Sequence, residues 1–304
     1  MNDKQRMARN EMRRRAEQNF NEKHYGKEQD VKEKRSLALF FDIFFKNIGS
    51  FFWMNLLYML AVAPVIICVF FLSRLLNGTD MTAEDFQWLP TFIYVPILFG
   101  VLLGPVTAAL TYLERKLLTQ KHIFFWSDFA EQFKKNFKQS WFFGILDTLC
   151  IMSVGSLSPM LINVFKAEQI PMKLVWIMGG FFLVVFVYFS MRPYLYLQVV
   201  TVKLTVGQMA RNAFFFVVLA VKNNIISFLI FITVIIVTFA AIPWSLILCA
   251  TVELSLVWFV CIWFAYKKFY ELLIAPELER IEQERKLNPG AESDELDELD
   301  DLYE

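Results

Sequence analysis

Long apolar stretches separated by short polar segments dominate the chain. Residues 50–73, 86–113 and 223–252 contain no Asp, Glu, Lys or Arg. Apolar stretches of about 18 residues or more are typical of membrane-spanning helices. The pattern therefore predicts an all-α, polytopic membrane protein with six transmembrane helices. We place these spans at 50–73, 89–113, 141–163, 174–197, 223–242 and 244–266.

The composition supports a membrane protein over a soluble one. Of the 304 residues 57% are hydrophobic, and 33 are Phe. This exceeds the apolar share of an ordinary soluble domain, which is about 45–50%. A soluble globular enzyme or a nucleic-acid-binding domain is therefore not expected.

The distribution of Lys and Arg predicts the orientation. With six spans, the segments on the side of the N-terminus carry 26 Lys and Arg, and the segments on the other side carry 3. Cytoplasmic loops are enriched in Lys and Arg. Both termini are therefore expected in the cytoplasm, in a multi-pass arrangement.

The segment between the second and third spans combines basic and aromatic residues. Residues 114–140 contain six Lys or Arg, and Phe recurs at every fourth position. This spacing lines up one face of a helix, and Ser127 or Asp128 could cap its start. Either the helix lies in the lipid headgroup layer with its apolar face down, or it packs on the cytoplasmic face of the bundle. The aromatic stripe is Phe125, Phe129, Phe133 and Phe137, and the lysines beside it are Lys134, Lys135 and Lys138.

Similar amphipathic stretches precede the first, third and fifth spans. Each contains a Lys-Asn pair, at Lys46-Asn47, Lys135-Asn136 and Lys222-Asn223, separated by 89 and 87 residues. Equal spacing is the signature of internal repeats. One interpretation is three pseudo-repeats, each an interfacial helix followed by two spans.

Two charged tails flank a membrane domain at 37–283. The arm at 1–36 contains eleven Lys or Arg against seven Asp or Glu. It is either a solvated arm that enforces topology or a contact for anionic lipid or nucleic acid; we favour the former and expect no nucleic-acid partner. The tail at 284–304 is acidic and is expected to be disordered.

Residue types that carry catalysis are sparse. The two histidines, His24 and His122, lie far from any cluster of metal ligands, and the common nucleotide-binding and hydrolase motifs are missing. The four cysteines are interpreted as small apolar packing residues. The sequence therefore predicts a non-catalytic protein with no cofactor and no metal.

Three charged residues inside the predicted spans are the candidates for a functional site: Asp147, Arg192 and Glu253. Such residues usually face protein or a water-filled cavity. Asp147 and Arg192 lie at matching depths, so they either form an ion pair or reach the interface separately. Glu253 is either a proton or substrate site, or a protonated side chain hydrogen-bonded to a neighbouring helix.

Prolines interrupt several of the predicted spans, and kinked helices occur in transporters. They also occur in passive bundles, so the prolines alone do not decide the function. The prolines concerned are Pro64, Pro96, Pro105, Pro159 and Pro193.

The segment 104–141 also carries a family resemblance. It contains a Gly-Pro, a Tyr and a basic end to a span, then Trp-x-Asp-Phe, spaced aromatics and a basic Asn-Phe-Lys-Gln run. In this pattern it resembles the YesL family of bacterial integral membrane proteins. The residues that carry the resemblance are Gly104, Pro105, Tyr112, Arg115, Lys116, Trp126, Asp128, Phe129, Phe133, Asn136, Phe137, Lys138 and Gln139.

The resemblance implies a location and a biological context. Proteins of that family lie in the bacterial cell membrane, and their genes often accompany binding-protein-dependent ABC sugar importers. The expected function is that of an accessory or scaffold in carbohydrate uptake, with the lipid bilayer and importer subunits as partners. The alternative is a permease-like transporter in its own right. The sequence predicts no oligomeric state.

Overall fold

The computed structural model describes residues 37–77, 83–166, 171–202 and 204–276, with Arg280 and Gln283, and all regular structure in these ranges is helical. The side chains of residues 75–92, 156 and 158–166 are not described, and the predicted arm at 1–36 and tail at 284–304 also lie outside the described residues. The elements are α2 (Leu37–Lys46), α3 (Ile48–Asn77), α4 (Ala83–Leu118), α5 (Phe125–Lys166), α6 (Met172–Thr201), α7 (Val206–Leu219), α8 (Val221–Ala240), α9 (Ser245–Leu248), the π-helical turn η1 (Cys249–Glu253), α10 (Leu254–Phe269) and a second π-helical turn, η2 (Tyr270–Ile274).

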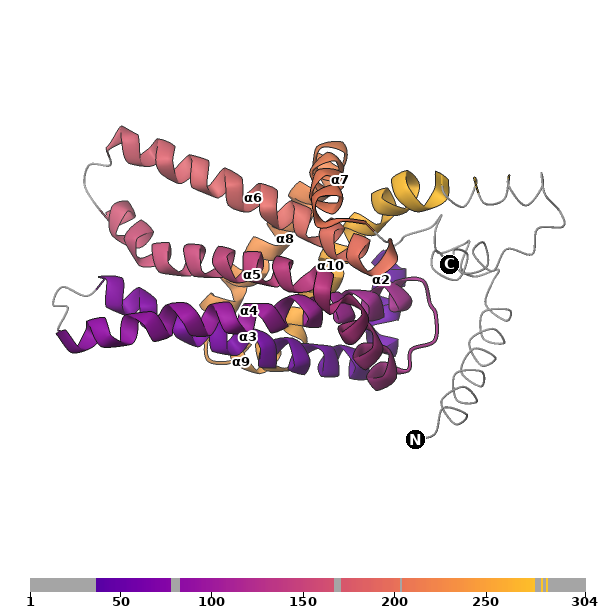
Figure 1. Ribbon diagram of the computed structural model, residues 1–304, viewed down its shortest axis with the longest axis horizontal. Coiled ribbons are helices and arrows are strands. Elements are labelled where there is room, and N and C mark those ends of the chain that lie inside the picture. The colour runs from indigo at the N-terminus through magenta and orange to yellow at the C-terminus, as the bar shows by residue number, and fades with distance from the viewer. Residues whose placement is uncertain are drawn as a thin grey trace.

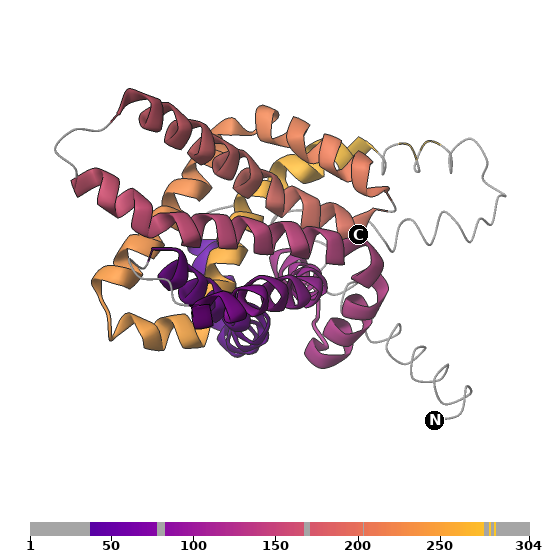
Figure 2. The same cartoon turned by 60° about the vertical axis from the view of Figure 1, so that its left-hand side comes forward.

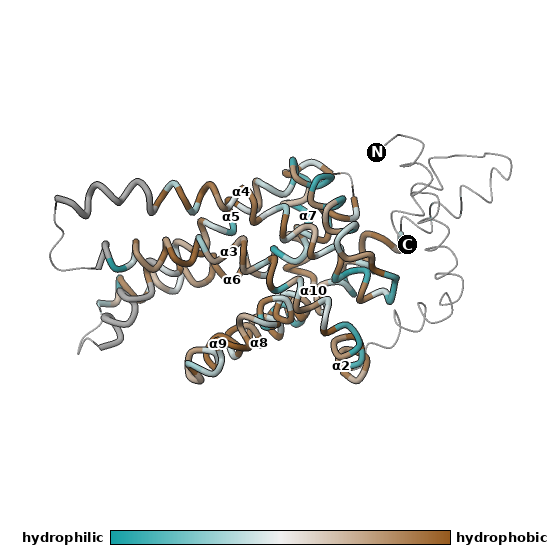
Figure 3. Tube along the Cα trace, turned by 90° about the horizontal axis from the view of Figure 1, so that it is seen from below, coloured by the Kyte–Doolittle hydropathy of each residue, from teal (hydrophilic) through white to brown (hydrophobic). Residues whose placement is uncertain are grey.

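The long helices α3, α4, α5 and α6 run along the length of the molecule (Figure 1). The hairpin of α8 and α9 crosses behind them at a different inclination. The turn between α4 and α5 lies at the same end as α2 and α7. Figure 3 shows hydrophilic residues gathered towards that end, whereas α8 and α9 are mainly hydrophobic. The charge segregation in the sequence is therefore also a segregation in space.

Five helices in the described part of the chain are long and apolar enough to cross a membrane. They are Ile48–Arg74, Ile93–Leu118, Met172–Thr201, Val221–Ala240 and Ser245–Ile274. These five helices agree with five of the six predicted spans to within a few residues at most ends. The remaining prediction, 141–163, lies within α5, where several side chains are outside the described part, and it is not among the five.

The segment predicted as a loop at 114–140 is mostly helical. Helix α4 continues to Leu118, and α5 already begins at Phe125, so only residues 119–124 connect them. The amphipathic helix is thus the first part of α5 rather than a separate element. Figure 2 shows this first part of α5 set at a steep angle to the remainder.

The three Lys-Asn pairs have different structural roles. Asn47 lies between α2 and α3 and donates to the Ile43 carbonyl at 2.9 Å, Asn136 donates to Gln132 within α5 at 3.0 Å, and Asn223 of α8 donates to the Phe264 carbonyl at 3.5 Å. The three Lys-Asn pairs therefore share no equivalent contact in the structure. Amphipathic segments do precede α3, the apolar part of α5 and α8, as predicted.

Helices α4 and α5 approach each other through small residues. A Cβ on Gly104 would lie 1.9 Å from the Ser140 carbonyl oxygen, and a Cβ on Gly144 would lie 2.2 Å from the Gly100 carbonyl oxygen. Gly100 and Gly104 are four residues apart, as are Ser140 and Gly144. Small residues at this spacing let two membrane helices pack with their backbones in contact. This crossing fixes the position of α5, and with it Asp147.

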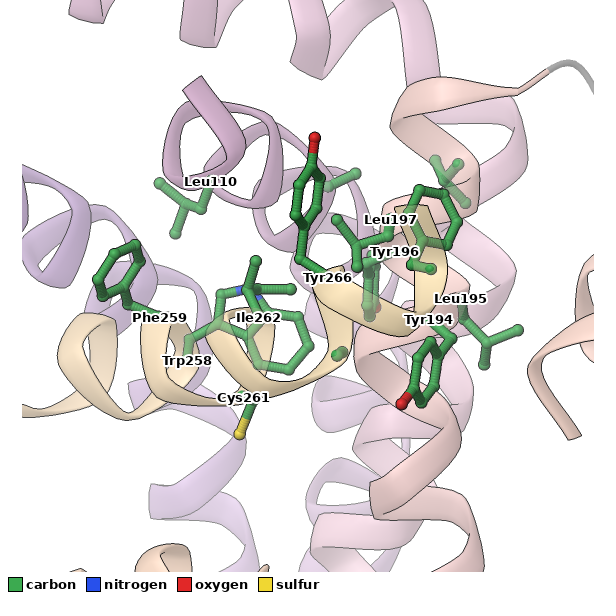
Figure 4. Packing of buried hydrophobic residues seen from close by; sticks show 14 of the residues in the cluster. Leu110, Tyr194, Leu195, Tyr196, Leu197, Trp258, Phe259, Cys261, Ile262 and Tyr266 are labelled. Carbon is green, nitrogen blue, oxygen red and sulfur yellow. The ribbon is translucent and has the colours of Figure 1, made fainter. Parts of the chain in front are cut away.

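The buried core joins α3, α4, α6, α7 and α10 at the hydrophilic end of the molecule. Figure 4 shows Tyr194, Tyr196 and Leu197 of α6 beside Trp258, Ile262 and Tyr266 of α10. Tyr194, Tyr196, Leu197 and Ile262 are fully buried. The opposite half of α6 is different, because Trp176, Ile177 and Leu183 are exposed there. Apolar surface of this kind is what lipid covers in a membrane protein.

A buried asparagine of α3 bonds the backbone around the π-helical turn of the last span. The Asn55 side chain of α3 donates to the Cys249 carbonyl at 2.9 Å and accepts from the Leu254 N–H at 2.8 Å and the Ser255 N–H at 3.2 Å. A π-helical turn leaves backbone groups without their usual partners, and at membrane depth the protein must satisfy them. Asn55 thus holds α3 against η1.

Replacing Asn55 with Ala is expected to destabilise the fold. Three backbone groups at η1 lose their partner in a fully buried place, and each unsatisfied group costs roughly 1–3 kcal/mol. We expect a loss of at least about 3 kcal/mol, measured by unfolding the purified protein in mixed micelles. Asn47→Ala is the matched control, since Asn47 bonds only one carbonyl of its own helix turn. Equal stability of the two variants would contradict the role of Asn55.

Candidate functional site

Asp147 of α5 lies at the centre of a buried hydrogen-bond network. Its Oδ1 accepts from the Tyr188 hydroxyl at 2.6 Å and from Arg192 Nε at 2.8 Å, and its Oδ2 accepts from the Tyr196 hydroxyl at 2.7 Å. Only 2% of the Asp147 side chain is exposed. Both carboxylate oxygens are therefore engaged by donors from α6, which lie one helical turn apart at positions 188, 192 and 196.

Arg192 joins the network to two further helices. Its Nη2 donates to the Tyr58 hydroxyl of α3 at 2.7 Å, and its Cζ lies 4.4 Å from the centre of the Trp258 ring of α10. An arginine over a tryptophan face gains from a cation–π interaction in addition to its ion pair. The ion pair between Asp147 and Arg192, one of the two alternatives from the sequence, is thus present and ties α5 to α6, α3 and α10.

The aromatic partners are themselves held in place. Trp258 Nε1 donates to Thr111 Oγ1 of α4 at 2.9 Å, and the Tyr196 ring packs against Phe143 and Trp258. Both Asp147 oxygens, Arg192 Nε and Nη2 and the Trp258 N–H all have partners within the protein. A solute that bound to these groups would have to displace at least one of the contacts. The arrangement can therefore hold five helices together, and Arg192 Nη1 is the one donor of this guanidinium and indole set that makes no hydrogen bond with a described residue.

Glu253 lies at the end of the π-helical turn η1 and is not part of this network. It accepts a hydrogen bond from the Thr238 hydroxyl of the neighbouring helix α8. Ser245, at the start of α9, donates to the Thr238 carbonyl at 2.5 Å. This contact corresponds to the structural alternative for Glu253, a carboxyl group bonded to an adjacent helix. It pins the α8–α9 hairpin near its tip.

The residues of the family resemblance gather at the turn between α4 and α5. Lys116 Nζ lies 3.2 Å from Asp128 Oδ2, which also accepts from the Phe124 N–H at 3.0 Å. Asp128 lies in the first turn of α5, accepts from the N–H just before the helix and pairs with the end of α4. Because α5 begins at Phe125, the N-cap predicted at Ser127 or Asp128 is wrong in position. The Tyr112 ring centre lies 5.7 Å from Arg115 Cζ and 5.3 Å from Lys116 Nζ. Gly104 and Pro105 belong instead to the buried helix crossing.

The buried face of the first part of α5 is polar, which the sequence did not indicate. Asp128, Gln132, Asn136 and Ser140 recur at every fourth position and are all buried. Phe129, Phe133 and Phe137 lie beside them, half-buried and packed ring against ring, while Lys134, Lys135 and Lys138 are exposed. Trp126 is exposed and Gln139 is half-buried.

This arrangement favours packing on the bundle over immersion of the phenylalanine face in lipid. The aromatic spacing predicted the correct helix but not the face that is buried. The polar stripe has the same four-residue period, so the period alone could not separate the two faces.

Two charged residues at the end of a span are buried: Glu114, which was not predicted as a site residue, and Arg115, which was named only for the family resemblance. Glu114 is fully buried, and neither of its carboxyl oxygens has a hydrogen-bond partner. Arg115 is 8% exposed, and its Nη1 also lacks a partner. In the sequence both seemed to begin a loop. The sequence did contain one signal that the helix continues: Leu113 and Leu117 flank these residues at helical spacing.

Groups suited to metal binding do not gather in the described part of the chain. No three His, Cys, Asp or Glu side chains lie together there. Cys68, Cys150, Cys249 and Cys261 are free thiols, and Cys261 is buried in the core. The described side chains therefore offer no metal centre.

Comparison with known proteins yields one family match. The model of the family described as "Protein of unknown function, DUF624" matches residues 51–155, about a third of the chain. The matched region contains the glycine crossing of α4 and α5, the charged residues at the turn between these helices, and Asp147. It ends before Arg192. No similar curated protein and no similar solved structure was found.

Proposed function

We propose that this protein is a non-catalytic, multi-pass membrane protein that acts as an accessory or scaffold in carbohydrate uptake. The observation that supports the non-catalytic, structural part of the proposal is the network around Asp147 and Arg192. Both Asp147 oxygens and two of the three Arg192 nitrogens bond to other helices, as expected of a bundle that presents a fixed surface. The carbohydrate context comes from the resemblance to the YesL family, with which the family match at 51–155 is compatible.

The proposal includes a six-span topology with both termini in the cytoplasm of a bacterial cell. The sixth span would be the part of α5 at 141–163, preceded by the amphipathic segment. The excess of Lys and Arg on one side supports this orientation. The three amphipathic segments support an arrangement as three pseudo-repeats. Reporter fusions after residues 122 and 169 should report opposite sides of the membrane.

The partner proposed for this scaffold is a subunit of an ABC sugar importer. The surface available for it is the exposed basic side of α5, with Lys134, Lys135 and Lys138. Purification of the full-length protein in a mild detergent, from cells grown on oligosaccharide, should recover importer subunits. A variant with all three lysines changed to Gln should recover less of them. Recovery of no importer subunit by the wild-type protein would contradict the proposal.

A permease is the second candidate, favoured by Glu253 at a π-helical turn within the last span. Such turns are frequent at functional sites. Proline residues also lie within α3 and α6, at Pro64 and Pro193, and irregular helices are common in transporters. Flux of sugars or oligosaccharides into proteoliposomes that contain the purified protein would favour this candidate over the scaffold.

The Glu253→Gln variant separates the structural and transport roles of that residue. An amide oxygen can still accept from Thr238, so we expect stability to change by less than about 0.5 kcal/mol. Unfolding in mixed micelles measures this. Thr238→Val, which removes the donor, is the companion variant and should cost about 1 kcal/mol. If Glu253→Gln keeps full stability but abolishes a measured flux, the carboxyl group belongs to a transport site.

A further inference from the structure

Arg115 is a buried cation without an anionic partner. It lies in the last turn of α4, with 8% of its surface exposed. Its Nη1 is buried without a hydrogen-bond partner, and its guanidinium makes no hydrogen bond or ion pair with any described residue. A buried charge of this kind is unfavourable unless an anion pairs with it. The structure therefore contains a positive site that calls for an anion from outside the described chain.

The neighbouring side chains do not neutralise Arg115. Asp128 lies 3.2 Å from Lys116 and also accepts from the Phe124 N–H. Glu114 precedes Arg115 in the chain, but neither of its carboxyl oxygens accepts a hydrogen bond from the guanidinium. Tyr112 orients Arg115 and Lys116 over its ring without supplying an anion. Two cations thus converge on one tyrosine, and one of them is unpaired.

The position of this cluster indicates which anion is available. Trp126, two residues before Asp128, is exposed and packs edge-on against the exposed Trp53 with ring centres 5.4 Å apart. Tryptophans of membrane proteins collect at the level of the lipid headgroups. Arg115 lies in the last turn of α4, close in the chain to this level, so in a membrane the nearest abundant anions are the phosphate groups of lipid. The guanidinium fork matches two phosphate oxygens, and basic pockets between membrane helices bind lipid headgroups.

We propose that Arg115, with Lys116 and Tyr112 beside it, binds a phosphate group at the end of α4. The phosphate comes either from the headgroup of an anionic phospholipid or from phosphate in solution. A bound phosphate supplies the missing acceptor for the guanidinium and neutralises the excess charge of the cluster. The proposal is independent of carbohydrate uptake, because it is tested by binding alone.

The experiment titrates phosphatidylglycerol onto the full-length protein in a mild detergent and detects the bound lipid by native mass spectrometry. Arg115→Gln is expected to weaken binding of the first lipid about tenfold. Arg211→Gln is the matched control, since it makes the same substitution at an exposed position on α7, and it should bind as the wild type does. Arg115→Lys should fall between the two, because an ammonium lacks the two-pronged geometry of guanidinium.

Inorganic phosphate distinguishes the two sources. If phosphate displaces phosphatidylglycerol from the wild type but not from Arg115→Gln, the site takes phosphate from solution as well. If phosphate has no effect while the Arg115 variants lose the lipid, the ligand is the headgroup. Should Arg115→Gln fail to give a monodisperse sample, Arg115→Lys decides. Wild-type affinity in both Arg115 variants, or an equal loss in Arg211→Gln, would overturn the proposal.

Discussion

Replacing Asp147 with Ala should lower the free energy of unfolding by about 3–5 kcal/mol, the range for removing one partner of a buried ion pair. The variant leaves the Arg192 charge without its carboxylate. It also leaves two tyrosine hydroxyls, of Tyr188 and Tyr196, without an acceptor. Asp147→Asn should cost less, because the amide keeps an oxygen that accepts from tyrosine. Unfolding of the purified protein in mixed micelles measures both.

Asp42 provides the control for that experiment. It pairs with Lys46 at 2.7 Å, but its side chain is 48% exposed and that of Lys46 is 72% exposed. An exposed pair of this kind contributes about 0–1 kcal/mol, so Asp42→Ala should be nearly as stable as the wild type. If Asp147→Ala is no less stable than Asp42→Ala, the buried network does not hold the bundle together.

A double-mutant cycle tests the coupling directly. Asp147→Ala combined with Arg192→Met should lose less stability than the sum of the two single changes, by about 1–3 kcal/mol. Exchanging the two charges is expected to rescue little. The Trp258 ring face suits a cation at position 192, and the tyrosine hydroxyls donate to an acceptor at position 147. Strict additivity of the single changes would contradict the ion pair.

Gly104→Leu should destabilise the protein by about 3 kcal/mol, at the upper end of the usual cost of overpacking. Even the first atom of the new side chain would lie 1.9 Å from the Ser140 carbonyl oxygen and 2.9 Å from the Gly144 nitrogen. These are backbone atoms, which cannot rotate away, so α4 and α5 would have to separate. The separation would move Asp147 relative to Arg192. Unfolding in mixed micelles measures the loss.

Gly179→Leu is the matched control for Gly104→Leu. Gly179 lies in α6, where a Cβ would meet no atom within 4 Å. Leucine has a better helix propensity than glycine by up to about 1 kcal/mol, so this variant should be neutral or slightly more stable. A Gly104→Leu protein as stable as Gly179→Leu would show that the two backbones do not touch in the membrane.

The apolar runs of the sequence were sufficient to predict five of the spans. A helix that faces lipid must be apolar along its whole length, so its signal is long and needs no knowledge of its neighbours. The ends of the spans were predicted less accurately. Glu114, Arg115 and Lys116 were assigned to a loop because charged residues usually end a span, yet all three are buried in the last turns of α4. Asp128 of α5 pairs with Lys116 there, whereas both Glu114 oxygens and Arg115 Nη1 have no hydrogen-bond partner among the described residues.

Partners between distant segments required the tertiary structure. The matching depths of Asp147 and Arg192 suggested a pair, but Tyr58, Tyr188, Tyr196 and Trp258 carried no signal of their own. Asn55, 194 residues from Cys249, was likewise one polar residue in an apolar helix. Hydrogen bonds between helices depend on which faces meet, and hydropathy does not record this.

The sequence by itself determined that the chain is helical and that several of its helices are long and apolar enough to cross a membrane, because both follow from the composition of local segments. The tertiary structure decided which face of each helix is buried. It buried a polar stripe of α5 and left the phenylalanine stripe beside it half-buried against the core, because the faces that meet depend on how the helices pack. The glycine crossing of α4 and α5 positioned Asp147 for its contact with Arg192.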